Sequence, residues 1–182
     1  MRVRYRDQDD IDELGRAGYL RIGRIAGRSG YVGALLTVNA RGEPLEFTWN
    51  MVATPQSALW RAADLRRNAV KLLAASLLEA IVNPPDLLLC PARQSMDDLF
   101  RLDIEPVVPV CLVPGAADAG DDGAQSRDTD IALVWLPAPP PAASPQHALL
   151  DALERRRLLL EPFERAGAGL REVYAGSEAG PL

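Results

Sequence analysis

The chain has 182 residues, of which 48% are hydrophobic and 25% charged, and its formal net charge is −5. This length suits one full domain with a sizeable core, and the composition is that of a globular protein. No apolar run approaches the roughly 18 residues of a membrane span, and the charged start MRVRYRDQDD does not fit a signal peptide. The net negative charge disfavours nucleic acid and acidic membranes as partners. We therefore expect a cytoplasmic protein that binds neither.

The N-terminal part of the sequence predicts a weak strand and then a β-hairpin. Residues 1 to 30 carry seven Arg against five acidic residues. Within them, YLRIGRIAG predicts an edge strand, because glycines interrupt it and Arg flanks it. The stretch GALLTVNARGEPLEFTWN predicts the hairpin: one strand runs over residues 31 to 38 and the other over 45 to 52. Gly42 allows a positive φ in the turn between them.

A long amphipathic helix is predicted over residues 54 to 83. Thr54 is its expected N-cap, Pro55 takes the first helical position, and Pro84 stops the helix. Asp64 offers a second N-cap at which the helix can break. The apolar stripe at spacings of three and four predicts packing on a sheet, and it comprises Leu59, Ala63, Val70, Leu73, Ala74, Leu77, Leu78 and Ile81.

Two further strands and a short helix are predicted between residues 86 and 113. DLLLC is short and entirely apolar, which is typical of a central strand covered on both faces. Ser95 caps a short helix over residues 96 to 102. In VVPVCLV, Pro109 cannot donate to a ladder, so we expect that strand at an edge or a bulge. Cys90 and Cys111 lie in these apolar runs and are expected as reduced core thiols.

The C-terminal third predicts a loop, a strand and a separate helix. Residues 114 to 130 lack periodicity and are expected to form a mobile loop. IALVWL predicts a buried strand, and residues 137 to 145 a stiff Pro-rich linker. The last helix begins at Ser144 and is expected to kink or end at Pro162.

Together these elements predict an α/β fold in a single domain, with a mixed sheet of about five strands. A long helix follows the N-terminal hairpin, and a C-terminal helix follows the Pro-rich linker. In this scheme residues 1–136 form the α/β domain, with the mobile loop at 114–130. Residues 137–145 form the linker, and 146–182 form the helix and tail.

Over roughly residues 31 to 113, the order of hairpin, helix, strand and short helix, together with GALLTV, is similar to the cytidine-deaminase arrangement. That family holds zinc with a His or Cys near a Glu on the first helix and a Pro-Cys-x-x-Cys at the next strand end. Here RNAVKLLAAS has neither ligand, and LLLCPARQS has one Cys in the wrong register. The resemblance therefore implies shared architecture and carries no zinc chemistry.

An enzyme of unrecognised class is one alternative, with a pocket at the C-terminal end of strand 86–90, where open α/β folds bind ligands. Cys90, Arg93, Asp97 and Asp98 would line that pocket. A nucleophilic thiol needs a positive neighbour or a His base, and the only histidine, His147, lies beyond the linker. A buried structural thiol is the favoured interpretation, so we lean against an enzyme and predict no catalytic residue, no metal and no cofactor.

A nucleic-acid accessory factor that uses the Arg-rich N-terminus is a further alternative. The best basic cluster elsewhere is the row Arg61, Arg66, Arg67 and Lys71 on the long helix, a candidate site for an anion or nucleic acid. Asp64 lies within the row and competes as an intrahelical partner. No RNP-type aromatics accompany the row, which disfavours this alternative.

The leading hypothesis is a non-catalytic interaction protein, a small bacterial-type domain that acts within a homomeric or heteromeric complex. One candidate surface is the polar row Glu46, Thr48 and Asn50, which is either the exposed side of a half-buried strand or a docking face. The other is the Leu149, Leu153 and Leu160 stripe, which packs either on its own sheet or on another chain. On this hypothesis the partner is a protein or a second copy of the chain.

Overall fold

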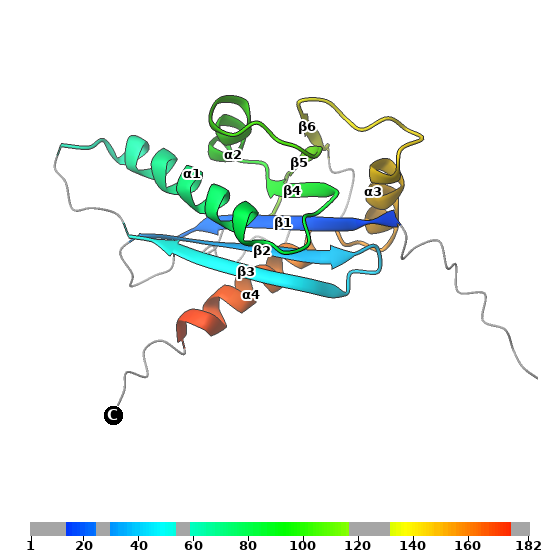
Figure 1. Ribbon diagram of the computed structural model, residues 1–182, viewed down its shortest axis with the longest axis horizontal. Coiled ribbons are helices and arrows are strands. Elements are labelled where there is room, and N and C mark those ends of the chain that lie inside the picture. Colours follow the sequence, from blue (N-terminus) through cyan, green and yellow to red (C-terminus); the bar gives the residue numbers. More distant parts are fainter. Residues whose placement is uncertain (1–13, 25–29, 54–58, 117–131, 176–182) are drawn as a thin grey trace, which may run out of the picture.

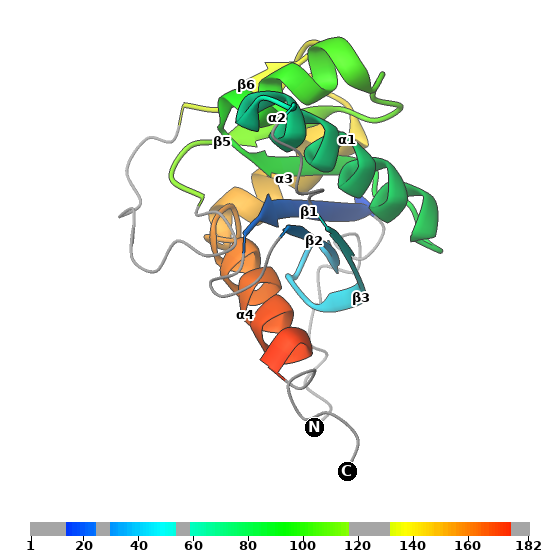
Figure 2. The same cartoon turned by 90° about the vertical axis from the view of Figure 1, so that its left-hand side faces the viewer.

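The computed structural model describes residues 14–24, 30–53, 59–116 and 132–175, and the fold is given for these ranges. They form one mixed sheet of six strands in the order β3-β2-β1-β4-β5-β6. Helices cover both faces of this sheet (Figures 1 and 2). The predicted α/β fold with a mixed sheet is thus confirmed, with one strand more than the expected five. None of the described helices is long and apolar enough to cross a membrane.

Strand β1 (Arg16–Gly23) lies in the middle of the sheet, so its prediction as a weak edge strand is wrong. It pairs antiparallel with β2 (Tyr31–Asn39) and parallel with β4 (Leu87–Pro91). Gly18 and Arg21 of this strand are accommodated by close packing. A Cβ on Gly18 would lie 2.8 Å from Cγ of Pro85, and the Arg21 guanidinium is buried under a C-terminal helix.

The predicted hairpin is confirmed. Strand β2 pairs antiparallel with β3 (Pro44–Val52), which forms one edge of the sheet. Gly42 has the positive φ, 82°, that the turn requires. The Asn39 side-chain oxygen accepts hydrogen bonds from the backbone N–H groups of Arg41 and Glu43, both at 3.0 Å, and so stabilises the turn.

Strand β4 is buried along its whole length, as its apolar sequence predicted. It pairs parallel with β5 (Val110–Val113), which begins one residue after Pro109 and therefore loses no ladder donor to it. Strand β5 is flanked on its other side by β6 (Val134–Leu136). The strand predicted at 131–136 is thus a three-residue edge strand rather than a buried one. Most of the predicted loop 114–130 lies outside the described residues.

Helix α1 (Ala62–Ala80) begins later than predicted, after Arg61. The predicted cap at Thr54 lies outside the described residues. Helix α1 packs one face on the sheet together with α2 (Gln94–Asp98) and the π-helical turn η2 (Leu99–Asp103). The short helix predicted at 96–102 therefore corresponds to these two elements.

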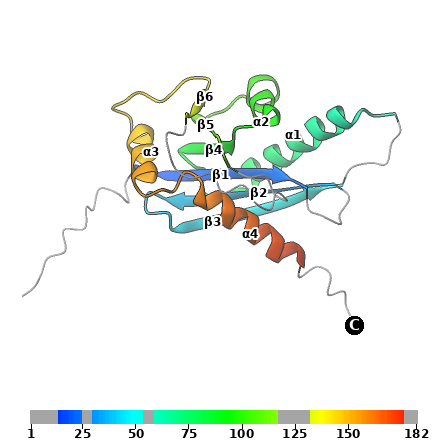
Figure 3. The same ribbon diagram turned by 180° about the vertical axis from the view of Figure 1, so that it is seen from behind.

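The opposite face of the sheet is covered by α3 (Pro145–Arg155) and α4 (Glu161–Ala175) (Figure 3). The Ser144 hydroxyl accepts a hydrogen bond from the backbone N–H of His147 at 3.2 Å, so the predicted cap is confirmed. The expected interruption at Pro162 comes earlier, where Arg157 has a φ of 59°. Pro162 instead lies in the first turn of α4, where its missing N–H costs no helical bond.

Candidate nucleic-acid interface

The candidate site lies at the end of the sheet where β1 and β4 finish. These strands are parallel neighbours, and the chain leaves β1 toward β2 on one side and β4 toward β5 on the other. Open α/β sheets bind ligands outside the carboxyl ends of strands at such a switch point. In Figures 1 and 3 the N-terminal part of α1 extends past this end of the sheet. Strand β1 and helix α1 therefore bring their charged residues to one end of the molecule.

Arginines follow both strands at this end. Arg24 comes directly after β1, is exposed, and lies with its guanidinium carbon 5.7 Å from the centroid of the Tyr31 ring. Arg93 comes two residues after β4 and is half-buried at the start of α2. The switch point thus carries two guanidinium groups, which recognise phosphate and carboxylate oxygens well.

Residues 59–68, which are the three residues before α1 and its first two turns, form a segment that we call the overhang. Every side chain in this segment is exposed except that of Leu65, which is half-buried, and full burial begins at Ala69. Arg66 precedes the buried Val70 by one helical turn, so it continues the sheet-facing stripe of α1 beyond the sheet. The overhang therefore presents the side chains of more than one helix face to solvent.

The predicted basic row is divided by the structure into two parts. Arg61 and Arg66 are exposed in the overhang. Arg67, also in the overhang, and Lys71, just beyond it, converge on Asp103 of η2. Arg67 donates two hydrogen bonds to the Asp103 carboxylate, at 2.8 and 2.9 Å, and the Lys71 ammonium lies 3.8 Å from it. The hydrogen bond from Arg67 lowers the pKa of Asp103, whose side chain is only 10% exposed. Asp103, rather than the predicted Asp64, is therefore the acid seen to pair with this row.

A cavity of about 630 Å³ lies next to this cluster. Asp103 is part of its wall, and Arg101 on the same wall donates to Asp97 at 2.6 Å. The cavity lies between η2 and the end of β6, and its lining comprises residues 100–106, Leu136 and Pro137. It is thus distinct from the pocket predicted at the end of strand 86–90.

The polar row of β3 faces α1 and binds it. Glu46 accepts hydrogen bonds from the backbone N–H groups of Val82 and Asn83, at 2.9 and 3.1 Å, just beyond the end of α1. These bonds lower the pKa of Glu46. Asn50 donates to the Ser76 hydroxyl of α1 at 3.0 Å. Thr48, between them, is 3.5 Å from the Leu35 carbonyl oxygen. The row therefore anchors the edge strand to the helix above it.

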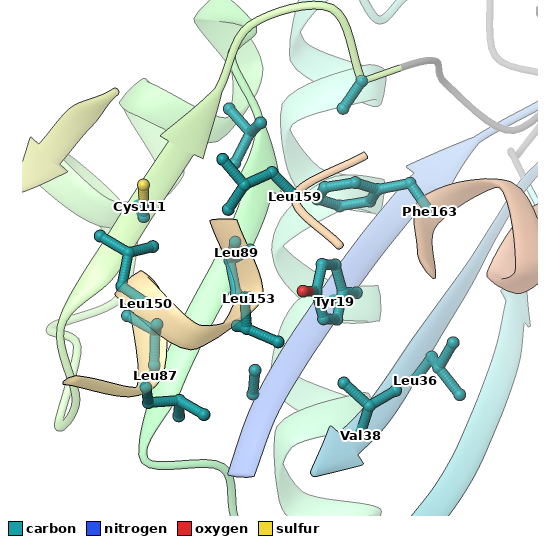
Figure 4. Packing of buried hydrophobic residues seen from close by; sticks show 14 of the residues in the cluster. Tyr19, Leu36, Val38, Leu87, Leu89, Cys111, Leu150, Leu153, Leu159 and Phe163 are labelled. Atoms are coloured by element: carbon teal, nitrogen blue, oxygen red, sulfur yellow. The ribbon is translucent and has the colours of Figure 1, made fainter. Parts of the chain in front are cut away.

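The leucine stripe of the last helices lies in the core of its own chain. Leu149 and Leu153 are fully buried, and Leu160 is half-buried against the same cluster. Figure 4 shows Leu153 close to Tyr19 of the central strand, with Leu159 and Phe163 nearby. Of the two outcomes left open by the sequence, packing on the chain's own sheet is the one observed.

The two cysteines are buried and free. Cys90 packs on the α1 side of the sheet and Cys111 on the α3 side. Burial raises the pKa of both thiols, that of Cys111 to about 12. A thiol in this state is a poor nucleophile at neutral pH, so the arrangement does not support the alternative of Cys90 as a catalytic residue. Within the described ranges no group of three or more His, Cys, Asp or Glu could hold a metal ion.

No protein-family model matches the chain. Part of it is similar to the CRM-domain containing factor CFM3, chloroplastic/mitochondrial, of Oryza sativa subsp. japonica, with 36% identity over 85 residues. This match covers 45% of the chain and 9% of that protein. The chain therefore spans less than a tenth of the curated relative that it matches.

Solved structures that partly resemble the chain include two endonucleases V and an Argonaute. Endonuclease V from Streptomyces avermitilis has a TM-score of 0.41 and 16% identity, over 63% of this chain and 58% of that one. Endonuclease V from Ciona intestinalis, in complex with a 24mer DNA, has a TM-score of 0.40 and 11% identity, over 60% of this chain and 56% of that one. Marinitoga piezophila Argonaute, in complex with guide RNA and target DNA, has a TM-score of 0.31 and 9% identity, over 61% of this chain and 18% of that one. These values do not place the chain in a family.

The comparisons correct two predictions. The chain was expected to be a non-catalytic protein within a protein complex, or self-associating, and nucleic acid was disfavoured as a partner. The finding against both is the similarity of part of the chain to a CRM-domain containing factor, at 36% identity over 85 residues. The net charge of −5 does not decide against such a partner, because a whole-chain sum says nothing of how charges are distributed over the surface.

Sequence reasoning also missed Trp60. It placed this residue inside a longer helix that packs on the sheet, next to Leu59 of the apolar stripe. In the structure both side chains precede α1 and are exposed, Leu59 at 94% and Trp60 at 53%. The spacing of apolar residues cannot show where a helix passes the end of the sheet that covers it.

Proposed function

We propose that this chain binds nucleic acid through the overhang of α1 and the adjoining ends of β1 and β4. The observation that carries the proposal is the position of the basic row, which lies partly on exposed helix turns that extend past the switch point of the sheet. Residues 59 to 71 contain four basic residues against one acidic residue, in a chain whose net charge is negative. A local excess of this kind attracts phosphates even where the whole chain does not.

The side chains differ in how freely they can reach a phosphate. Arg61 and Arg66 are exposed in the overhang, and Arg24 lies at the neighbouring strand end. Arg67 and Lys71 share the Asp103 carboxylate, so a phosphate must compete with that carboxylate for them. We therefore expect binding of moderate affinity with a modest dependence on salt, because few cations make the contacts and the slope grows with the number of counterions displaced.

The test is a fluorescence-anisotropy titration of a labelled oligonucleotide at several salt concentrations. The double variant Arg61→Ala/Arg66→Ala removes two exposed cations and should weaken binding at every sequence. It should also reduce the slope of log affinity against log salt by roughly 1.4 for a single strand. The matched control is Arg155→Ala/Arg156→Ala, which removes two exposed arginines near the end of α3, at the opposite end of the sheet in Figure 1. Equal weakening by both variants would contradict this location of the site.

A variant that should strengthen binding tests whether the Asp103 carboxylate competes with phosphate for Arg67 and Lys71. Asp103→Asn keeps the side-chain shape but removes the charge that holds Arg67 and Lys71, so binding should strengthen by roughly two- to fivefold. Asp151→Asn on α3 removes the same charge from a half-buried position away from the basic row and is the control. Tighter binding by both variants would mean that only the net charge of the protein affects its affinity for the oligonucleotide.

We also propose a cytoplasmic location. It is supported by the two buried free thiols, which are typical of reducing compartments.

A further inference from the structure

Trp60 is an exposed aromatic side chain next to the basic row, and neither the core nor the phosphate contacts proposed above use it. Its side chain is 53% exposed, and the residue directly precedes Arg61, the N-cap of α1. An indole in this position exposes a large apolar surface to water, which is unfavourable unless a ligand covers it. The cations that follow it along the overhang indicate a ligand that is both aromatic and anionic.

We infer that this surface takes single-stranded nucleic acid and that one base stacks on the indole of Trp60. The inference rests on the proposed function and names its substrate class. A stacking platform needs an unpaired base whose flat face is free, and single strands supply such bases whatever their sequence. Arg61 then lies beside the stacked nucleotide to contact its phosphate, and Arg66 lies one to two turns further along the helix.

Duplex DNA fits the same surface less well. Its bases are already stacked on one another, so the indole gains no partner without the cost of opening the duplex. A duplex also carries one negative charge per about 1.7 Å of its axis, and the chain that approaches it has a net charge of −5. A single strand that lies along this short basic surface leaves fewer phosphates outside the contact than a duplex does.

Trp49 provides an internal comparison. Its exposure is 49%, close to that of Trp60. Its ring, however, makes an edge-to-face contact with Tyr174 at a centroid distance of 5.7 Å. It lies on the edge strand and packs against α4, on the side of the sheet opposite to α1. If the loss of any exposed tryptophan weakened binding, a Trp49 variant would show the same loss as a Trp60 variant. If a base stacks on Trp60, only the Trp60 variant should bind more weakly.

The experiment uses the full chain and two probes, an oligothymidylate of about 12 nucleotides and the same strand paired with its complement. We expect the single strand to bind at least tenfold more tightly than the duplex at equal salt. Trp60→Ala should weaken binding of the single strand by roughly 5- to 150-fold, and Trp60→Phe should recover part of the loss. Trp49→Phe should leave binding unchanged. The salt slope of Trp60→Ala should equal that of the unmodified chain, because stacking displaces no counterions.

The outcomes separate this inference from the proposed function. If the duplex binds as tightly as the single strand, or Trp60→Ala binds like the unmodified chain while Arg61→Ala/Arg66→Ala is weakened, the single-strand inference is wrong and the proposed function stands. If neither probe binds the unmodified chain, both are wrong. Thermal unfolding of Trp60→Ala and Trp60→Phe shows that each variant is folded, which the exposure of the side chain leads us to expect.

Discussion

Replacing Leu153 with Ala should lower the free energy of unfolding by about 2 to 5 kcal/mol. Leu153 is 0% exposed and packs between α3 and the face of the sheet that carries Tyr19. The substitution removes apolar contacts and leaves a cavity that the close-packed core fills only in part. Urea unfolding followed by circular dichroism measures the loss.

Leu72→Ala is the matched control, because it makes the same change in another helix. Leu72 is 48% exposed on the outer side of α1, so its truncation should cost about 0.5 kcal/mol or less. If Leu153→Ala were as mild as this control, α3 would not be part of the core. The leucine stripe would then again be a candidate surface.

Gly167→Ala should also destabilise the protein, although Ala is the better helix former by about 1 kcal/mol. A Cβ on Gly167 of α4 would lie 2.7 Å from Cζ of Arg21 on the central strand. Arg21 is 3% exposed, and its guanidinium donates to the Phe163 carbonyl oxygen at 2.6 Å. Displacing it from this buried site costs about 1.5 to 3 kcal/mol for the charged hydrogen bond. The expected net loss is about 0.5 to 2 kcal/mol.

A double-mutant cycle shows whether Arg21 is the cause. In an Arg21→Ala background the guanidinium is absent, so Gly167→Ala should become neutral or stabilising through its helix propensity. The coupling between the two positions should therefore be about 2 kcal/mol. If Gly167→Ala cost the same in both backgrounds, the contact between α4 and β1 would not be the reason for this glycine.

The hairpin, the buried strand and the C-terminal helix cap could be predicted because local chemistry determines them. Gly42 provides the turn, the apolar run at 87 to 90 requires cover on both faces, and Ser144 caps the first turn of α3. The central position of β1 could not be predicted in this way. It depends on Pro85 and α4, which lie far away in the sequence. Pro85 fills the space that a Cβ on Gly18 would need, and α4 provides the Phe163 carbonyl oxygen that accepts from Arg21.

The candidate site was predicted only in part, for a similar reason. The basic row was visible as a helical pattern, but its acidic partner Asp103 is 36 residues away from Arg67 along the chain. The overhang could not be predicted, because the sequence of α1 shows its apolar stripe but does not show where the sheet beneath the helix ends. Trp60 was therefore assigned to a helix that packs on the sheet, although it precedes α1 and is exposed.

The most direct test of nucleic-acid binding at the overhang is ultraviolet crosslinking of the full chain to a thymidine-rich single strand, followed by mass spectrometry of the peptides. The account predicts crosslinks within residues 59 to 71, with Trp60 among the modified residues and with Arg24 or Arg93 at the neighbouring strand ends. Crosslinks confined to α3 at the other end of the sheet, or a chain that forms no crosslink at low salt, would contradict it.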